Sequence, residues 1–294
     1  MTIDIHFGDN LDILATLEAA SIDLIYVDPP FNTGREQRLT ALKTVRDDDG
    51  DRVGFGGRSY RTEKLGSTAF ADVFDDFLGF LEPRLIEFKR VLTDDGSLFL
   101  HFDQRESHYA KVLLDELFGR DCFKNEIIWS YDFGGRSKRR WPAKHDTILW
   151  YTKDPERYTF RYDDIDRIPY MAPGLVTKEK AARGKTPTDV WWQTIVPTNS
   201  KERTGYPTQK PIQILNRIVR VHSNPGDMVA DFFAGSGTTG EAAALNERRS
   251  ILVDDNQAAI QVMAKRLAQW SPLFHGIPTP ELDEEGLQAA PRLL

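Results

Sequence analysis

The segment VADFFAGSGTTGEAAALN (residues 229–246) constrains the fold most strongly, because an apolar strand runs directly into glycines and then into an alanine-rich helix. A second apolar run follows this helix and ends at Asp254. Gly235 and Gly237 permit a tight turn and a close approach of the backbone to a ligand. A carboxylate at the end of the next strand is placed to accept hydrogen bonds from both hydroxyls of a ribose. The segment therefore predicts a nucleotide-type pocket at one edge of a parallel sheet.

The charge beside the glycine loop separates two classes of ligand. Gly235, Gly237 and Gly240 have the G-x-G-x-x-G spacing of NAD-binding folds, so an NAD-dependent oxidoreductase is one interpretation. Asp231, one residue into the turn region of the preceding strand, faces a positively charged ligand better than a pyrophosphate. The acid therefore favours a cationic cofactor such as S-adenosylmethionine. A titration with S-adenosylhomocysteine or NADH would separate the two interpretations.

Short apolar runs alternate with helix-length segments along most of the chain, which is typical of a parallel sheet covered by helices. Strands are predicted at Ile3–Phe7, Leu24–Val27, Ser97–Phe102, Met228–Phe233 and Ser250–Val253. An amphipathic helix is predicted from Phe77 to Leu92. Residues 126–131 and 147–151 are expected to form an antiparallel pair or two neighbouring edge strands, with the basic stretch between them exposed. The pattern predicts an α/β fold.

A second cluster of chemically distinctive residues ends the predicted strand at Val27. It consists of Asp28, Pro29, Pro30 and Phe31. The prolines lack amide hydrogens and have a fixed φ, so this corner offers carbonyl acceptors beside a carboxylate. Acceptors without donors suit an exocyclic amine such as N6 of adenine or N4 of cytosine. They can accept both amine hydrogens and direct the nitrogen lone pair towards a methyl donor, while an aromatic ring stacks on the base.

Three motifs together resemble those of the DNA amino-methyltransferases: DPPF at 28–31, DFFAGSGTTG at 231–240 and YPTQKP at 206–211. The first precedes the second along the chain, which is similar to the circularly permuted β class of that family. The resemblance extends over most of the chain outside residues 35–68 and the last 24 residues. It implies a Rossmann-like class I methyltransferase fold, with a mixed, mostly parallel seven-stranded sheet and helices on both faces.

The resemblance also implies roles for individual residues. Asp28, Pro29, Pro30 and Phe31 would bind and orient the target amine, with Asp28 also bordering the cofactor. The loop around the methionine part of S-adenosylmethionine would consist of Asp231, Phe233, Gly235, Ser236, Gly237 and Thr238. Asp254 would bind the ribose, Asp9 would lie near the cofactor adenine, and Lys210 would lie in the segment that leads into a cofactor-side helix. Phe31 departs from the commoner Tyr of this motif, which removes one hydroxyl and keeps the stacking face.

The chain carries 38 basic and 45 acidic residues, so its net charge of −7 excludes a highly basic chromatin-type protein. A DNA enzyme then needs a local basic face, because phosphate contacts must hold a duplex from which one base has been extruded. Such a face is predicted between the two antiparallel runs, where Trp141 is interleaved with basic residues. These are Arg136, Lys138, Arg139, Arg140 and Lys144.

The length of 294 residues suits two domains or one large α/β domain with insertions. We expect the catalytic half at residues 1–154, with a long surface loop over about 35–68. An irregular target-recognition region is expected at 155–206, the cofactor-binding half at 207–270 and a tail at 271–294. A single cysteine and a start that does not resemble a signal sequence predict a cytoplasmic protein. No metal site is expected.

The DPP form of the catalytic motif is associated more often with adenine in this family, so the sequence predicts an adenine-N6 DNA methyltransferase. Double-stranded DNA is the expected partner, together with a second copy of the chain and, in a restriction–modification system, a cognate restriction endonuclease. Methylation of cytosine N4 stays open. Three further interpretations are an RNA or protein-amide methyltransferase, an NAD-dependent oxidoreductase and a catalytically silent DNA-binding protein.

Overall fold

A computed structural model of the chain describes residues 2–30, 35–46, 52–53, 59–72 and 76–280, with the backbone alone over 35–72. Within these residues the main sheet has nine strands, in the order β12-β1-β11-β10-β2-β6-β8-β7-β9. Their bounds, in that order, are Leu273–His275, Ile3–Phe7, Arg249–Asp254, Met228–Asp231, Ile22–Val27, Leu92–Phe102, His145–Thr152, Phe123–Ser130 and Val190–Trp192. The seven strands that lie between β12 and β9 in this order form the expected sheet. The three-residue strands β12 and β9 extend it at its two edges.

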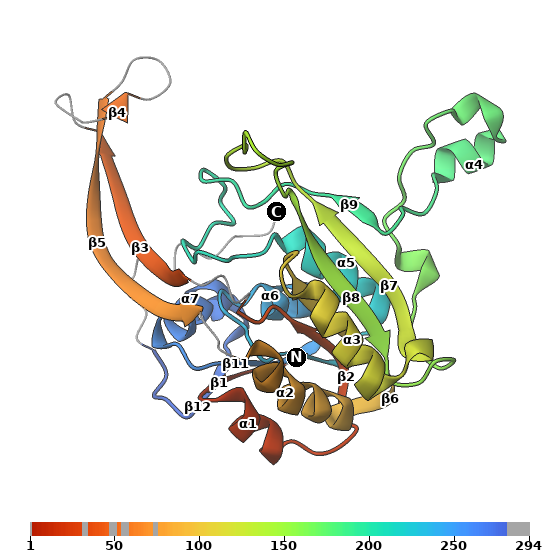
Figure 1. Ribbon diagram of the computed structural model, residues 1–294, viewed down its shortest axis with the longest axis horizontal. Helices are drawn as coiled ribbons and strands as arrows, with labels where there is room; N and C mark the ends of the chain where they lie inside the picture. Colours follow the sequence, from red (N-terminus) through yellow and green to blue (C-terminus); the bar gives the residue numbers. More distant parts are fainter. Residues whose placement is uncertain (1, 31–34, 47–51, 54–58, 73–75, 281–294) are drawn as a thin grey trace.

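Helices cover both faces of this sheet (Figure 1). One face packs against α1 (Asn10–Thr16), α2 (Phe77–Val91) and α3 (Ser107–Phe118). The other packs against α5 (Ile212–His222), α6 (Thr238–Leu245) and α7 (Gln257–Leu267). The apolar stripe predicted for the helix near residue 77 is buried, as Leu81, Leu85 and Phe88 show. The α/β architecture with helices on both faces is therefore confirmed.

The strand order also confirms the circular permutation. β10 and β11 come late in the chain, yet they lie in the sheet between β1 and β2. β10 pairs in parallel with β2, and β11 pairs in parallel with β1. The amino-terminal and carboxy-terminal parts of the chain thus share one sheet. The helix after β10, α6, covers one face of it, and the next helix after β2, α2, covers the other.

The expectation of a long irregular loop over residues 35–68 is wrong. Strands β3 (Arg35–Arg46) and β5 (Ser59–Asp72) pair antiparallel in a separate sheet with the short strand β4 (Arg52–Val53). This hairpin projects from the body of the molecule (Figure 1). Its strands mix charged and apolar residues without a strict alternation. The ladder pairs backbone groups, and the sequence of these strands has no period-two pattern, so hydrophobic periodicity does not reveal them.

The beginning of the expected tail forms a strand, β12. β12 pairs in parallel with β1, and the ring of His275 stacks on that of His6 with centroids 4.4 Å apart. Three residues are too few to show a recognisable strand period. Residues 281–294 lie outside the described part of the chain.

Residues 155–206 consist mainly of loops and 3-10 turns, with the short helix α4 (Lys178–Arg183) standing away from the sheet (Figure 1). The segment rejoins the main sheet at β9, which pairs in parallel with β7. Trp191 is buried there and Trp192 is exposed. The indole of Trp129 donates to the carbonyl of Gln193 at 2.6 Å, which fixes this return to the sheet.

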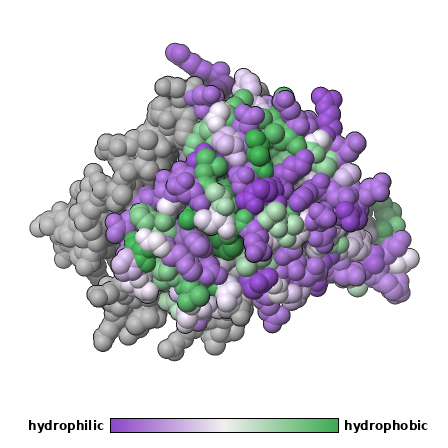
Figure 2. Space-filling model, turned by 90° about the horizontal axis from the view of Figure 1, so that it is seen from below, coloured by the Kyte–Doolittle hydropathy of each residue, from purple (hydrophilic) through white to green (hydrophobic). Residues whose placement is uncertain are grey.

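The view from below shows a face on which hydrophilic residues surround smaller apolar patches (Figure 2). Among the residues that the structure describes, none of the helices combines the length and the apolar character needed to cross a bilayer.

Candidate active site

The two chemically distinctive motifs meet at the carboxyl ends of β2 and β10. These strands are parallel neighbours, with Leu24 opposite Val229 and Ile25 opposite Ala230. Asp28 follows β2 and Asp231 ends β10, so both carboxylates reach the same edge of the sheet. Both line one cavity of about 430 Å³, which is within the size range of small-molecule sites. The crevice beyond the carboxyl ends of the strands is where open α/β sheets bind ligands.

The glycine loop takes its shape from two residues with positive φ. Gly235 has φ +49° and Gly237 has φ +73°. A Cβ on Gly235 would lie 3.0 Å from the ring of Tyr206, and one on Gly237 would lie 2.8 Å from Met263. Gly235 lines the cavity. Gly237, which immediately precedes α6, packs against Met263 of α7 instead. Of the glycines predicted to surround the cofactor, Gly237 therefore supports the loop from behind.

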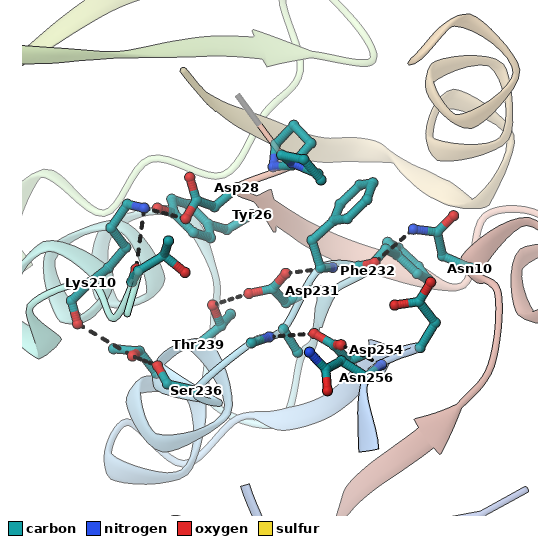
Figure 3. Close-up of a pocket in the computed structure, with 18 of the residues that line it drawn as sticks. Asn10, Tyr26, Asp28, Lys210, Asp231, Phe232, Ser236, Thr239, Asp254 and Asn256 are labelled. Carbon is teal, nitrogen blue, oxygen red and sulfur yellow. Dashed lines mark hydrogen bonds and ion pairs between the residues drawn. The ribbon is translucent and has the colours of Figure 1, made fainter. Parts of the chain in front are cut away.

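Asp231 is a buried acid at the centre of the site (Figure 3). Its carboxylate accepts the amide of Phe233 at 3.0 Å and the hydroxyl of Thr239 at 2.6 Å. Burial raises the pKa of Asp231 to about 7, and the charges of Asp28 and Asp254 also raise it. Burial disfavours the ionised form of this carboxyl group, and a cation that enters the cavity stabilises that form.

Asp254 ends β11 on the other side of the glycine loop. One carboxylate oxygen accepts the amide of Gly235 at 2.8 Å, and the other accepts the amide of Asn256 at 2.9 Å (Figure 3). Burial raises the pKa of Asp254 to about 6. Each oxygen of an ionised carboxylate can accept a further hydrogen bond. Asp254 thus holds the loop in place and retains acceptor capacity towards the cavity.

The residue Asp9, which follows β1, adds a further acid to the cavity, as the sequence predicts. Asp9 caps α1 by accepting the amide of Leu11 at 2.7 Å, and it lies 3.4 Å from a guanidinium nitrogen of Arg84. The neighbouring Asn10 is buried and donates to the carbonyl of Phe232 at 2.8 Å (Figure 3). Arg84 donates in turn to Asn10 at 2.7 Å. This chain of contacts ties α1 and α2 to the glycine loop.

Asp28 is held by partners from two distant parts of the chain. Lys210 donates to Oδ2 of Asp28, and both side chains are about nine-tenths buried (Figure 3). Oδ1 of Asp28 is buried and has no hydrogen-bond partner among the described residues. The imidazole Nδ1 of His101 lies 3.9 Å from Oδ1. The carboxylate is therefore anchored through one oxygen and presents the other as an acceptor.

The cavity collects almost all the residues that the sequence predicts for the site. Its lining includes Asp9, Asp28, Pro29, Pro30, Lys210, Asp231, Phe233, Gly235, Ser236, Thr238 and Asp254. Phe31 lies outside the described residues. Sequence reasoning missed Asn10, Tyr26, Arg84 and Tyr206, which also line the cavity. Tyr26 and Arg84 stand in an apolar strand and on the buried face of an amphipathic helix, and a polar residue in such a place is the signal that could have revealed them.

The predicted basic face is exposed in part. Lys138, Arg139 and Arg140 are exposed in the loop between β7 and β8. Arg136 is exposed and pairs with Asp132 at 2.8 Å. Lys144 donates to backbone carbonyls of its own loop, including that of Gly135 at 3.2 Å. Lys144 therefore shapes the loop, whereas Lys138, Arg139 and Arg140 present their charge to solvent.

The sheet order, the permutation and the acid-lined cavity define a class I methyltransferase. Residues 22–266 match a family model described as DNA methylase, the N6/N4 family. The chain is 32% identical over 254 residues to the type II methyltransferase M.HpaI of Haemophilus parainfluenzae, covering 86% of this chain and 70% of the relative. It is 30% identical over 268 residues to the DNA adenine methyltransferase YhdJ of Escherichia coli K12, covering 88% and 81%.

Solved structures show the same fold at lower identity. The M1.HpyAVI–S-adenosylmethionine complex superposes with a TM-score of 0.58 at 20% identity, covering 90% of this chain and 99% of that one. The cytosine-N4-specific PvuII DNA methyltransferase superposes with a TM-score of 0.61 at 15% identity, covering 90% and 86%. The chain belongs to the N6/N4 DNA methylase family. It is an S-adenosylmethionine-dependent DNA amino-methyltransferase.

Proposed function

We propose that this protein methylates the N6 amine of adenine in double-stranded DNA, after the base has left the helix. The observation that carries the proposal is the position of Asp28. Its Oδ1 is a buried acceptor without a partner among the described residues, beside Pro29 and Pro30 at the rim of the acid-lined cavity. An amine with two hydrogens to donate supplies what this corner lacks.

S-adenosylmethionine supplies an electrophilic methyl group on a positively charged sulfur when it is bound. Asp28 and the carbonyl of Pro29 accept the two hydrogens of the target amine. This weakens the conjugation of the nitrogen lone pair with the ring and directs it towards the methyl group. Asp28 then accepts the proton that the methylated nitrogen must release. Phe31 is proposed to stack on the base.

The residues of the cavity fit the cofactor. The methionine part has a cationic ammonium group, which suits the buried carboxylate of Asp231. Phe233, Gly235, Ser236 and Thr238 would surround this part, with Gly237 supporting the loop. Asp254 would accept the ribose hydroxyls, Asp9 would lie towards the adenine, and Lys210 would bridge the cofactor side and Asp28.

DNA would be held by the exposed loop between β7 and β8. Arg139 and Arg140 present two charges there, and Lys138 and Arg136 add to them. Phosphate contacts of this kind position a duplex without reading its sequence. Residues 155–206 are proposed to read base edges in the major groove.

Two observations support adenine as the target. The catalytic motif has the DPP form, and a relative at 30% identity is named a DNA adenine methyltransferase. Cytosine N4 is the second candidate, because the same fold occurs in a cytosine-N4-specific enzyme. Both amines donate two hydrogens, so the acceptors at Asp28 suit either one.

The test is to methylate DNA with the purified protein and labelled S-adenosylmethionine, digest it to nucleosides and identify the product by mass spectrometry. The proposal predicts labelled N6-methyldeoxyadenosine. Labelled N4-methyldeoxycytidine would assign the alternative base, and sequencing of the modified sites would give the target. A cognate restriction endonuclease is also proposed, since several relatives are named type II methyltransferases. A homodimer is proposed from the resemblance of the sequence motifs to those of the family.

A further inference from the structure

Four polar side chains form a chain of hydrogen bonds behind Asp28, inside the sheet. His101, on β6, is fully buried. Its Nδ1 lies 2.7 Å from the hydroxyl of Tyr26 on β2, and its Nε2 lies 3.2 Å from Oδ2 of Asp146 on β8. The hydroxyl of Tyr131, just after β7, donates to Oδ1 of Asp146 at 3.0 Å. Three adjacent strands and the end of a fourth therefore meet at one imidazole.

The protonation states of these hydrogen-bonded side chains follow from that of Asp146. Burial would raise the pKa of Asp146, but the hydrogen bonds from His101 and Tyr131 and the charge of Lys210 hold that pKa below its ordinary value. An ionised carboxylate only accepts hydrogen bonds, so the Nε2 of His101 must carry a hydrogen. Burial, with the nearby charge of Asp28, raises the pKa of Tyr26 well above its ordinary value, so its hydroxyl keeps its proton. In the neutral imidazole with a hydrogen on Nε2, Nδ1 has a lone pair and accepts a hydrogen bond from the hydroxyl of Tyr26.

This arrangement has a consequence for Asp28. In the Nε2–H tautomer, Nδ1 of His101 has a lone pair and no hydrogen to donate across the 3.9 Å to Oδ1 of Asp28. The hydroxyl of Tyr26 is already directed to Nδ1. Lys210 bonds the opposite oxygen of Asp28. Within the described part of the chain, Oδ1 therefore stays a buried acceptor without a partner, although leaving such a group unpaired costs free energy.

We propose that His101 is a positioning residue for methyl transfer, which reserves Oδ1 of Asp28 for the target amine by accepting the hydroxyl of Tyr26. Asp146 imposes the tautomer in which His101 can do so. This role rests on the proposed function of Asp28. In the opposite tautomer, Nδ1–H would donate to the hydroxyl oxygen of Tyr26 at 2.7 Å, and the hydroxyl hydrogen of Tyr26 would be released to the nearby Asp28, where it would occupy the acceptor that the amine needs.

A second buried histidine provides a matched control. His222 packs among aromatic rings, with centroids 4.7 Å from Phe99 and 4.3 Å from Trp150. Burial lowers the pKa of His222 to about 3, so it stays neutral. It does not line the cavity, and its substitution tests the loss of a buried imidazole as such.

The experiment reads the tautomer of His101 directly and relates it to turnover. The chain has six histidines, so a protein labelled with ¹⁵N in histidine gives few imidazole signals, and comparison with His101→Gln assigns that of His101. We expect Nε2–H in the wild type. Asp146→Leu removes the acceptor, and we expect the hydrogen to move to Nδ1 and kcat to fall by about 100-fold, as for a misplaced reacting group. Binding of S-adenosylhomocysteine should be unchanged.

Asp146→Asn is the conservative variant. Its side-chain oxygen can still accept from Nε2–H while its amide faces Tyr131, so we expect it to keep the tautomer and most of the wild-type kcat. His222→Gln should leave both unchanged. Nδ1–H in the wild type would overturn the proposal without any variant. Two results for Asp146→Leu would also overturn it. In the first, the imidazole hydrogen of His101 moves to Nδ1 and kcat stays at the wild-type value. In the second, kcat falls although the hydrogen stays on Nε2.

The outcome for the wild type separates this proposal from the one on which it rests. Wild-type protein that transfers no methyl group to DNA would overturn the proposed function, and the role of His101 with it. Active wild-type protein in which kcat does not follow the tautomer would overturn the role of His101 alone.

Discussion

Lys210 donates a hydrogen bond to Asp28 across 182 residues of sequence, and both side chains are about nine-tenths buried. Asp28 follows β2, whereas Lys210 lies just before α5. The pair therefore joins the part of the chain that carries the proposed catalytic motif to the part that carries the glycine loop. It also fixes which oxygen of Asp28 is left to face the amine.

Replacement of Lys210 by Met should destabilise the protein. The variant keeps most of the volume but leaves a buried carboxylate without its cation, so we expect a loss of about 3–5 kcal/mol in the free energy of unfolding. Urea denaturation measures this loss, with the exposed Lys201→Met as the control. Adding Asp28→Asn to Lys210→Met should restore part of the stability. Equal stability of wild type and Lys210→Met would show that the pair is not formed.

Affinity for S-adenosylmethionine should rise with pH through about 7. In the free protein burial raises the pKa of Asp231 to about 7, and the cationic ligand binds the ionised carboxylate better. Below this pH the acid must first lose its proton, so the affinity should fall by about tenfold for each pH unit. Asp254, whose pKa burial raises to about 6, should add a second decrease at lower pH.

Calorimetric titration between pH 5.5 and 8 measures this dependence. Asp231→Asn should bind more weakly and should lose the component near pH 7, while the decrease near pH 6 remains. A wild-type affinity that does not change over this range would contradict the role given to Asp231.

Alanine in place of Gly237 should destabilise the fold. The residue has φ +73°, and the added Cβ would lie 2.8 Å from Met263. We expect a loss of about 1–3 kcal/mol in the free energy of unfolding, from the backbone conformation and the close contact. Gly135→Ala is the matched control, since a Cβ there would meet no atom within 4 Å. Equal effects in thermal unfolding would show that the loop does not require glycine.

Replacement of Arg139 and Arg140 together by Ala should weaken DNA binding and reduce its salt dependence. Each phosphate contact contributes about 0.9 to the slope of log affinity against log salt, so the slope should fall by about 1.8. Fluorescence anisotropy at several salt concentrations measures it. Arg249→Ala, at the amino end of β11 and so at the opposite edge of the sheet, should leave the slope unchanged. An unaltered slope for the double variant would place the DNA elsewhere.

The sequence predicts the central strands and the site acids well, because each of those strands is a buried apolar run that ends at a polar residue. Asp28, Asp231 and Asp254 follow such runs, and parallel strands bring their carboxyl ends to one edge. The sequence does not reveal the hairpin of β3 and β5, since its strands show no strict alternation of apolar and polar residues. β12 was missed because three residues carry too little pattern.

The polar chain behind Asp28 is the part of the site that sequence could not predict. Tyr26 and His101 stand within apolar strands, and Asp146 stands at the start of another. Their proximity depends on the order of β2, β6 and β8 in the sheet, which is a property of the whole fold. A local sequence pattern shows that these polar residues stand in strands, but it does not show which strands are adjacent in the sheet.

The measurement that tests the central claim most directly compares cofactor binding and methyl transfer in Asp28→Asn. The amide oxygen of this variant can still bond Lys210, which places an NH₂ group where Oδ1 was. We predict that it binds S-adenosylhomocysteine with nearly wild-type affinity and transfers no detectable labelled methyl group to DNA, and that Asp28→Ala is equally inactive. Turnover close to that of the wild type in either variant would contradict the claim that Asp28 receives the target amine.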